Sequence, residues 1–278
     1  MIMNKKFRRV LLGATSVLAL TLVLAGCGKS AKSTTTVKVG IVGNDDEKIW
    51  KPIAKDVKKD GIDLKIVSFS DYTQPNQALN DKQIDINAFQ HYYFLDQWNK
   101  AHKTDLTSVG KTVVAPLGLF SKKVKQPGDF KKGDQIVIPN DATNEGRALN
   151  LLKNAGLIKV DNAKLPTPKD ITSNPKNLKI TPVAADQTPR SLDSATAAVV
   201  NNTYAVDAKL DIKKAVYAEK IDKNVKPYIN IIVARKADKN KKAIKTIVKD
   251  YQTKRNAKVI DKQFKGTSVP AWNLNVNK

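Results

Sequence analysis

Short apolar runs alternate with amphipathic stretches along most of the chain. Strand-like runs at 37–42 and 64–69 flank a stretch at 47–59, in which apolar side chains recur at helical spacing. The same alternation continues with a predicted helix at 75–80, a strand at 84–86 and a helix at 91–100. Strands that alternate with helices in this way indicate an α/β fold built on an open, mainly parallel sheet.

A second cycle of strands and helices follows an apolar stretch at 112–120. This cycle is predicted to contain strands at 135–139, 178–183, 195–200 and 228–234, and helices at 145–152, 241–252 and 257–263. Two α/β cycles of similar size predict two lobes, with the chain crossing between them near 112–120 and 228–234. Ligands of open α/β sheets bind beyond the carboxyl ends of the strands, so we expect a ligand site in the cleft between the lobes.

The first 27 residues have the pattern of a secretion signal. An uncharged apolar run at 10–25, too short for a comfortable transmembrane helix, follows a basic start formed by Lys5, Lys6, Arg8 and Arg9. The run ends at Leu24-Ala25-Gly26-Cys27, which resembles a bacterial lipobox. That resemblance implies cleavage before Cys27 and a diacylglycerol thioether on its sulfur. An ordinary signal peptide in which Cys27 is incidental is the alternative.

These patterns give an expected domain plan for the whole chain. We expect a lipoprotein signal peptide at 1–26, and a lipidated cysteine with a flexible polar tether at 27–36. The first part of lobe 1 is expected at 37–116, lobe 2 at 117–230, and the return of the chain to lobe 1 at 231–278.

Charge is the unusual feature of the composition. The 278 residues hold 49 Lys and Arg against 26 Asp and Glu, a net charge of +23. Removing the four cations before Cys27 leaves 45 against 26, or +19. The lysines are spread along the chain and no nucleic-acid motif accompanies them, so we expect no nucleic-acid partner. A solvated basic surface that faces an anionic membrane or cell wall is the preferred interpretation.

Catalysis and metal binding find little support in the sequence. One cysteine and two histidines exclude a disulfide framework and leave little scope for a Cys- or His-based metal site, so we predict no cofactor. The chain has no nucleophile elbow, no Walker A loop and no Gly-x-Gly-x-x-Gly turn. We therefore predict that the protein is not an enzyme.

Arginine usage singles out one candidate ligand contact. Downstream of Cys27 only four of the 45 cations are arginines, namely Arg147, Arg190, Arg235 and Arg255. Arg147 lies near the start of a predicted helix, just after a polar loop that ends a strand. A guanidinium fork suits a carboxylate, so Arg147 is a candidate for binding one. A surface arginine that pairs with a nearby acid is the alternative.

Four polar-aromatic segments follow predicted strands. The densest, 88–94, holds four aromatic residues and a histidine, and the others are 71–76, 201–204 and 227–230. Aromatic rings at a strand-to-helix junction favour an apolar pocket wall, although some of these rings are expected in the core. Asparagine after a strand is also a common turn or cap residue.

The chain resembles the methionine-binding lipoproteins of ABC importers, the NlpA-type lipoproteins, over residues 37–272. The matching stretches include Phe69-Ser70-Asp71-Tyr72, Phe89-Gln90-His91, Ile138-Pro139-Asn140-Asp141, Gly146-Arg147-Ala148-Leu149 and Val269-Pro270-Ala271-Trp272. The resemblance implies a two-lobed fold like that of periplasmic binding proteins and a small-molecule ligand, L-methionine or a close relative. It also implies an ABC permease as partner, a separate ATPase acting through it, and a lipid anchor on the extracytoplasmic face of the cell membrane.

The resemblance also implies roles for individual residues. Arg147 is similar to the residue that clamps the ligand carboxylate. Asn201 and Asn230 resemble the asparagines that hold the polar groups on the ligand's α-carbon. The pocket for the side chain is implied to include Tyr72, Phe89, His91 and Phe94.

One departure from the family pattern keeps the ligand open. The family usually has a proline-tyrosine pair shortly after the histidine, where this chain has Tyr93-Phe94. A dipeptide or another amino acid is therefore an alternative ligand. A basic surface adhesion protein and an exported enzyme on the same fold are the rival functions.

Overall fold

The computed structural model describes residues 34–274, which belong to one compact unit. The predicted signal peptide and Cys27 lie outside the described residues, as does most of the tether. Strand β1 begins at Thr35 and so includes the last two residues of the predicted tether.

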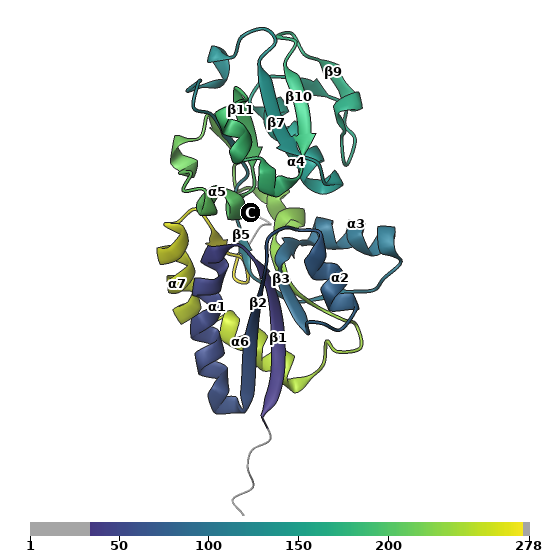
Figure 1. Cartoon of the computed structure of the whole chain (residues 1–278), viewed down its shortest axis with the longest axis vertical. Coiled ribbons are helices and arrows are strands. Elements are labelled where there is room, and N and C mark those ends of the chain that lie inside the picture. Colours follow the sequence, from purple (N-terminus) through teal and green to yellow (C-terminus); the bar gives the residue numbers. More distant parts are fainter. Residues whose placement is uncertain (1–33, 275–278) are drawn as a thin grey trace, which may run out of the picture. The chain divides into compact units, whose positions relative to one another are not determined.

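The first sheet joins segments from both ends of this unit (Figure 1). Its strand order is β2 (Ile62–Phe69), β1 (Thr35–Val42), β3 (Ile86–His91), β13 (Asn230–Ala234) and β4 (Thr107–Lys111). Strand β1 pairs in parallel with β2 and β3, whereas β13 runs antiparallel to β3 and β4. Four of the five strands therefore run in the same direction and only β13 runs against them, so the sheet is mainly parallel, as the sequence predicted.

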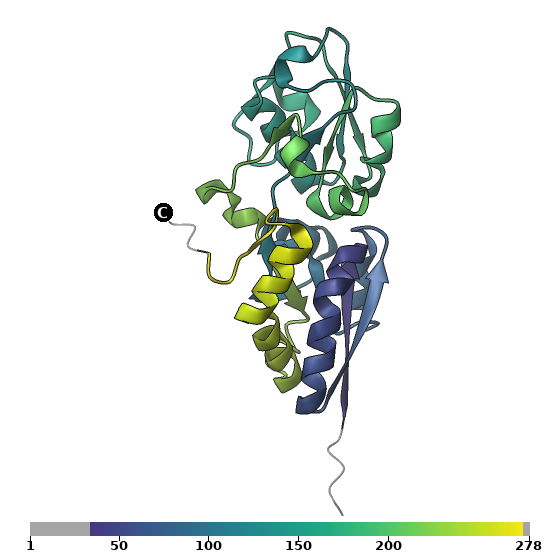
Figure 2. The same ribbon diagram turned by 90° about the vertical axis from the view of Figure 1, so that its left-hand side faces the viewer.

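Helices cover both faces of the first sheet. The two faces carry α1 (Asn44–Asp56), α6 (Lys242–Tyr251) and α7 (Lys254–Phe264) on one side, and α2 (Gln74–Asn80) and α3 (Tyr92–His102) on the other. Figure 2 shows α1 beside the two C-terminal helices. Each face has its own apolar core, so the strands between them are rich in Val and Ile.

The second sheet belongs to the other lobe, drawn at the top of Figure 1. Its strand order is β10 (Lys179–Val183), β7 (Gln135–Pro139), β11 (Ala197–Val200), β6 (Gly118–Phe120) and β12 (Tyr217–Ala218). Strand β7 pairs in parallel with β10 and β11, and β6 runs antiparallel to β11 and β12. Helices α4 (Ala142–Asn154) and α5 (Asn202–Asp207) contribute to its two apolar cores.

The chain passes between the two sheets twice within the described residues. It leaves the first sheet after β4 and continues through β5 (Val113–Val114), which pairs with β14 (Val269–Pro270), before it enters β6. It returns from β12 to β13 through the 3-10 helix η7 (Lys223–Tyr228). The other short elements are η1 (Val57–Asp60), η2 (Pro127–Asp129), η3 (Pro168–Asp170), η4 (Ala185–Gln187), η5 (Arg190–Asp193) and η6 (Ile212–Lys214), and a hairpin of β8 (Lys159–Val160) and β9 (Ile171–Ser173).

The third strand lies further along the chain than predicted. The strand expected at 84–86 is β3, and it runs from Ile86 to His91 with every residue buried. Its polar members are satisfied inside the lobe, because the Gln90 side chain bonds those of Asn76 and Asn87. The aromatic segment is therefore half strand and half helix, with α3 beginning at Tyr92.

Candidate functional site

A cavity lies between the two lobes, where strands of both sheets end. Its lining includes all seven residues selected from the sequence: Tyr72, Phe89, His91, Phe94, Arg147, Asn201 and Asn230. Four of them come from segments that follow or end strands β2 and β3, and two from segments that follow strands of the second sheet. Parallel strands end at one edge of their sheet, which brings these segments together.

Asn230 lies at the same edge of the first sheet, although it begins a strand instead of following one. It is the first residue of β13, an antiparallel neighbour of β3, and it pairs directly with His91, the last residue of β3. The start of an antiparallel strand lies at the same edge as the end of its partner. The Asn230 side chain therefore lines the cavity next to the aromatic segment.

Aromatic rings form one wall of the cavity. The Phe89 ring lies 5.9 Å from Tyr72 and 5.7 Å from Phe94, and Phe94 meets the His91 ring edge to face at 6.2 Å. Tyr93 does not belong to this wall, since its ring packs against Tyr228 at 5.9 Å on the other side of α3. Of the two positions that depart from the family pattern, only Phe94 lines the cavity.

His91 is uncharged and holds one defined tautomer. Its Nδ1 accepts a hydrogen bond from the Phe94 amide at 3.1 Å, so the ring proton is on Nε2. Burial, assisted by the positive charge of Arg147, lowers the pKa of His91 to about 3. The Nε2 group points across the cleft toward Asn144 Oδ1, 3.5 Å away.

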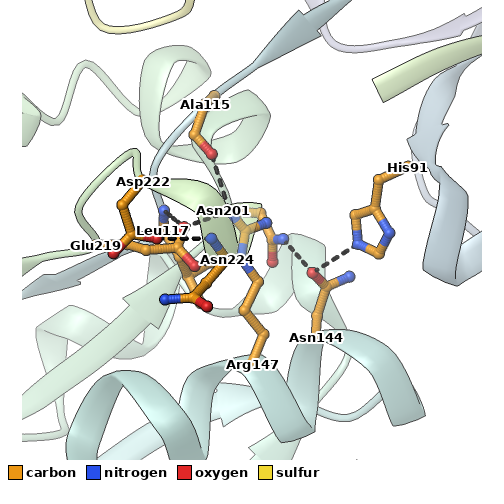
Figure 3. A network of polar contacts seen from close by, with 9 residues as sticks. All are labelled: His91, Ala115, Leu117, Asn144, Arg147, Asn201, Glu219, Asp222 and Asn224. Carbon is orange, nitrogen blue, oxygen red and sulfur yellow. Dashed lines mark hydrogen bonds and ion pairs between the residues drawn. The ribbon is translucent and has the colours of Figure 1, made fainter. Parts of the chain in front are cut away.

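Arg147 projects from the start of α4, whose N-terminus is capped by Asp141. The residue is only 6% exposed, so it is not a surface arginine. It nevertheless pairs with an acid, because Nε donates to Glu219 Oε1 at 3.0 Å and Nη2 pairs with Glu219 Oε2. Nη2 also donates to the Ala115 carbonyl at 2.9 Å (Figure 3). The Tyr228 ring lies 4.3 Å from the guanidinium carbon.

These contacts reduce the number of hydrogen-bond donors that Arg147 can direct to a ligand. Glu219 occupies the Nε–Nη2 edge of the guanidinium, so this edge is not available for bidentate binding of a ligand carboxylate. None of the contacts just described uses Nη1. The guanidinium therefore retains one nitrogen, with two hydrogens, for another acceptor.

Asn201 occupies the N-cap position of α5, but its side chain does not cap the helix. Its Nδ2 group donates instead to Asn144 Oδ1 at 2.8 Å (Figure 3). Its Oδ1 atom is buried and has no hydrogen-bond partner among residues 34–274. A buried acceptor without a donor is costly, so this oxygen is a candidate acceptor for a ligand donor.

The sequence did not indicate several of the groups around the cavity. Asp46 is part of the lining, and burial, with the carboxylates of Asp207 and Asp45, raises its pKa to about 8. Thr112, Thr203 and Ser268 also line it. Glu219 reaches Arg147 from outside the cavity. The one sequence signal for Glu219 is an acid that directly follows the apolar run Ala215–Ala218.

The charges around the cavity nearly cancel at neutral pH. Arg147 is neutralised by Glu219, and His91 is neutral. The raised pKa leaves Asp46 mostly protonated. Polar contacts in this cavity therefore come mainly from amide and guanidinium groups, an arrangement suited to a small molecule with balanced charges.

Residues 37–272 match the family model described as NlpA lipoprotein. The chain belongs to the NlpA lipoprotein family. A D-methionine-binding lipoprotein MetQ of Salmonella typhi is 41% identical over 265 residues, which cover 93% of this chain and 97% of that protein.

Solved structures of the same kind agree in fold. The substrate-binding protein of a methionine transporter from Streptococcus pneumoniae is 46% identical, with a TM-score of 0.82 over 85% of this chain and 96% of that one. A nutrient-binding protein from Burkholderia cenocepacia bound to methionine is 39% identical, with a TM-score of 0.81 over 84% and 99%. The predicted α/β fold with two lobes is confirmed.

Two further features of residues 34–274 bear on function. No group of three or more His, Cys, Asp or Glu side chains in this range is placed to hold a metal ion. None of the helices in that same range combines the length and the apolar character needed to cross a lipid bilayer.

Proposed function

We propose that this protein is the substrate-binding lipoprotein of an ABC importer, that it captures methionine in the interlobe cavity, and that it delivers it to a membrane permease. The observation that carries the proposal is a cavity with an uncharged aromatic wall on one side and, on the other, polar groups that can still form hydrogen bonds to a ligand. Membership of the NlpA lipoprotein family and relatives named for methionine support it.

The polar groups match the two charges of an amino acid. Arg147 Nη1 and an amide of Asn230 would donate to the ligand carboxylate, because a buried carboxylate needs several donors. The Oδ1 atom of Asn201, which has no hydrogen-bond partner among residues 34–274, would accept a hydrogen bond from the ligand ammonium. The net charge of such a ligand is zero, as is that of the Arg147–Glu219 pair that faces it.

The aromatic wall matches an apolar side chain with a sulfur. Tyr72, Phe89, Phe94 and the neutral ring of His91 would surround the thioether, and each sulfur–aromatic contact contributes about 0.3–1.5 kcal/mol. A charged side chain would lie unpaired against these rings, so glutamate and lysine are expected to bind far more weakly.

Delivery requires that the protein stays at the membrane. Cleavage before Cys27 and lipidation of its sulfur would anchor the chain on the extracytoplasmic face, with residues 27–36 as the tether. Two acyl chains give stable anchoring where one does not. The permease, powered by a separate ATPase, would then take the ligand from the lobes of residues 37–278. The protein itself would catalyse no reaction, like the relatives named as binding proteins.

A ligand screen tests this proposal. Protein stripped of ligand by unfolding and refolding is titrated with both enantiomers of methionine, with glutamate and lysine, and with methionine-containing dipeptides. We expect a strong thermal shift with methionine. Because the cavity lining reaches Asp46, a dipeptide is the competing ligand. A shift with a charged amino acid, and none with methionine or its dipeptides, would contradict the pocket assignment.

A further inference from the structure

A row of polar side chains leads from the N-terminus of α4 to the cavity. It begins at Asp141, the N-cap residue, and passes through Asn144 to Asn201. Figure 3 shows the contact between Asn144 and Asn201. Asn144 is 2% exposed and lines the cavity wall. Its amide has one donor end and one acceptor end, and its neighbours decide which end faces which way.

Asp141 fixes the donor end of Asn144. Its carboxylate can only accept, and it receives the Asn144 side-chain Nδ2 at 2.9 and 3.1 Å as well as the Asn144 backbone amide at 3.0 Å. A reversed Asn144 amide would place its oxygen against this carboxylate. The Nδ2 end therefore faces Asp141 and the Oδ1 end faces the cavity side.

His91 gives an independent indication of the same orientation. Its Nδ1 atom already accepts from the Phe94 amide, so its Nε2 atom carries the proton and can only donate. That Nε2 group points to Asn144 Oδ1 from the other lobe, at 3.5 Å. A donor therefore faces the Oδ1 end of Asn144 on two sides, since Asn201 Nδ2 donates to it at 2.8 Å.

The orientation of Asn201 follows from that of Asn144. With Nδ2 committed to Asn144, the Oδ1 atom of Asn201 is left buried without a partner. Without the acceptor on Asn144, the Asn201 amide has no reason to prefer this orientation, and its NH₂ group would repel a bound ammonium.

We infer that Asn144 is a positioning residue that selects for ligands with an amino group, because it turns the acceptor oxygen of Asn201 toward the ligand. The inference rests on the proposed function, in which an α-amino acid occupies the cavity. It adds that Asn144 sets the preference for the ammonium by orienting the Asn201 amide, and that Asp141 in turn fixes the orientation of Asn144.

The test compares two ligands that differ only in the amino group. Methionine and its deaminated analogue 4-(methylthio)butanoate are titrated by calorimetry into wild type, Asn144→Leu and the double variant Asp141→Asn/Asn144→Asp, which exchanges the amide and the carboxylate between the two positions. The matched control is Asn150→Leu, the same substitution on the same helix at a position outside the cavity lining. Thermal unfolding without ligand checks that each variant is folded.

The preference for methionine over the analogue is the quantity that decides. A hydrogen bond to a charged group contributes enough that its loss in Asn144→Leu should reduce the preference by about 10- to 100-fold. The double variant keeps an acceptor toward Asn201 and faces it with an amide at position 141 instead of a second carboxylate, so it should not lower the preference by more than about 3-fold. The same holds for Asn150→Leu, since neither change removes that hydrogen bond. A general loss of stability would weaken both ligands equally and leave the preference unchanged.

The remaining outcomes also discriminate. If wild type binds methionine and folded Asn144→Leu retains the full preference, the positioning role is overturned while the proposed function stands. If Asn144→Leu does not fold, the double variant Asp141→Asn/Asn144→Asp decides alone, and loss of the preference there overturns the inference. If wild type binds neither compound, the proposed function fails and the inference falls with it.

Discussion

The ion pair between Arg147 and Glu219 should separate stability from ligand binding. Replacing Arg147 with Met keeps most of the side-chain volume but leaves the Glu219 carboxylate with one remaining donor, the Leu117 amide. Loss of one partner of a buried pair costs about 3–5 kcal/mol. The Glu219 side chain is 18% exposed, so we expect the lower end, about 3 kcal/mol of unfolding free energy.

Removing both charges should restore much of that stability. In Arg147→Met/Glu219→Gln no charge is left unpaired, and replacement of a buried pair by neutral groups is often close to neutral. Binding should behave differently, because the ligand loses Arg147 Nη1 in both variants. One hydrogen bond to a charged group contributes about 1.5–3 kcal/mol, which is roughly a 10- to 150-fold weaker affinity for methionine.

Urea unfolding of the ligand-free proteins gives the stabilities, and calorimetry with methionine gives the affinities. Glu219→Gln alone is the control, since it keeps Arg147 and one neutral acceptor. We expect the double variant to recover stability relative to Arg147→Met without recovering affinity. Wild-type stability in Arg147→Met, or wild-type affinity for methionine in the double variant, would contradict the role given to this ion pair.

Three further outcomes are expected. Cys27→Ala should release the protein from the membrane fraction, and a variant that is still processed and membrane-bound would exclude the lipid anchor. Folding raises the pKa of Asp46, so the folded protein holds a proton that the unfolded chain has lost near neutral pH. The lowered pKa of His91 has the opposite effect on stability, but only below pH 6.5, where the unfolded histidine is protonated. The unfolding free energy should therefore fall between pH 6.5 and 8, by up to about 1.4 kcal/mol per pH unit. Asp46→Asn should flatten that fall in urea titrations at each pH, and an unchanged slope would assign it to another group. Gly43→Ala should destabilise the protein by about 1–3 kcal/mol, because φ is +95° and the new Cβ would lie 2.6 Å from Thr203, and an unchanged urea midpoint would contradict this.

Local sequence patterns predicted helices and strands correctly where the spacing of apolar residues along the chain matches the burial of those residues in the fold. A helix was predicted at 145–152, and the structure has α4 there, with Leu149 and Leu152 packed in the core of their lobe and Asp141 as its N-cap. Strand β3 was misplaced because Asn87 and Gln90 are polar. Their side chains satisfy each other inside the lobe, which no periodicity along the chain reveals.

The sequence predicted which residues line the candidate site, but not the hydrogen bonds and ion pairs that they form. Residues that follow strands were a sound guide, because strand ends converge on one edge of each sheet. The partner of Arg147 lies 72 positions away, so only the folded chain brings Glu219 to it. The orientation of the Asn201 amide likewise depends on Asn144, which is 57 positions distant.

The cavity between the lobes is expected to hold methionine in the protein as it is purified. Mass spectrometry under native conditions on freshly purified protein, followed by denaturation and identification of the released small molecule, would detect it. We expect one methionine per protein molecule in wild type and a lower occupancy in Arg147→Met. Release of a different compound from wild type, such as a charged amino acid, would contradict it.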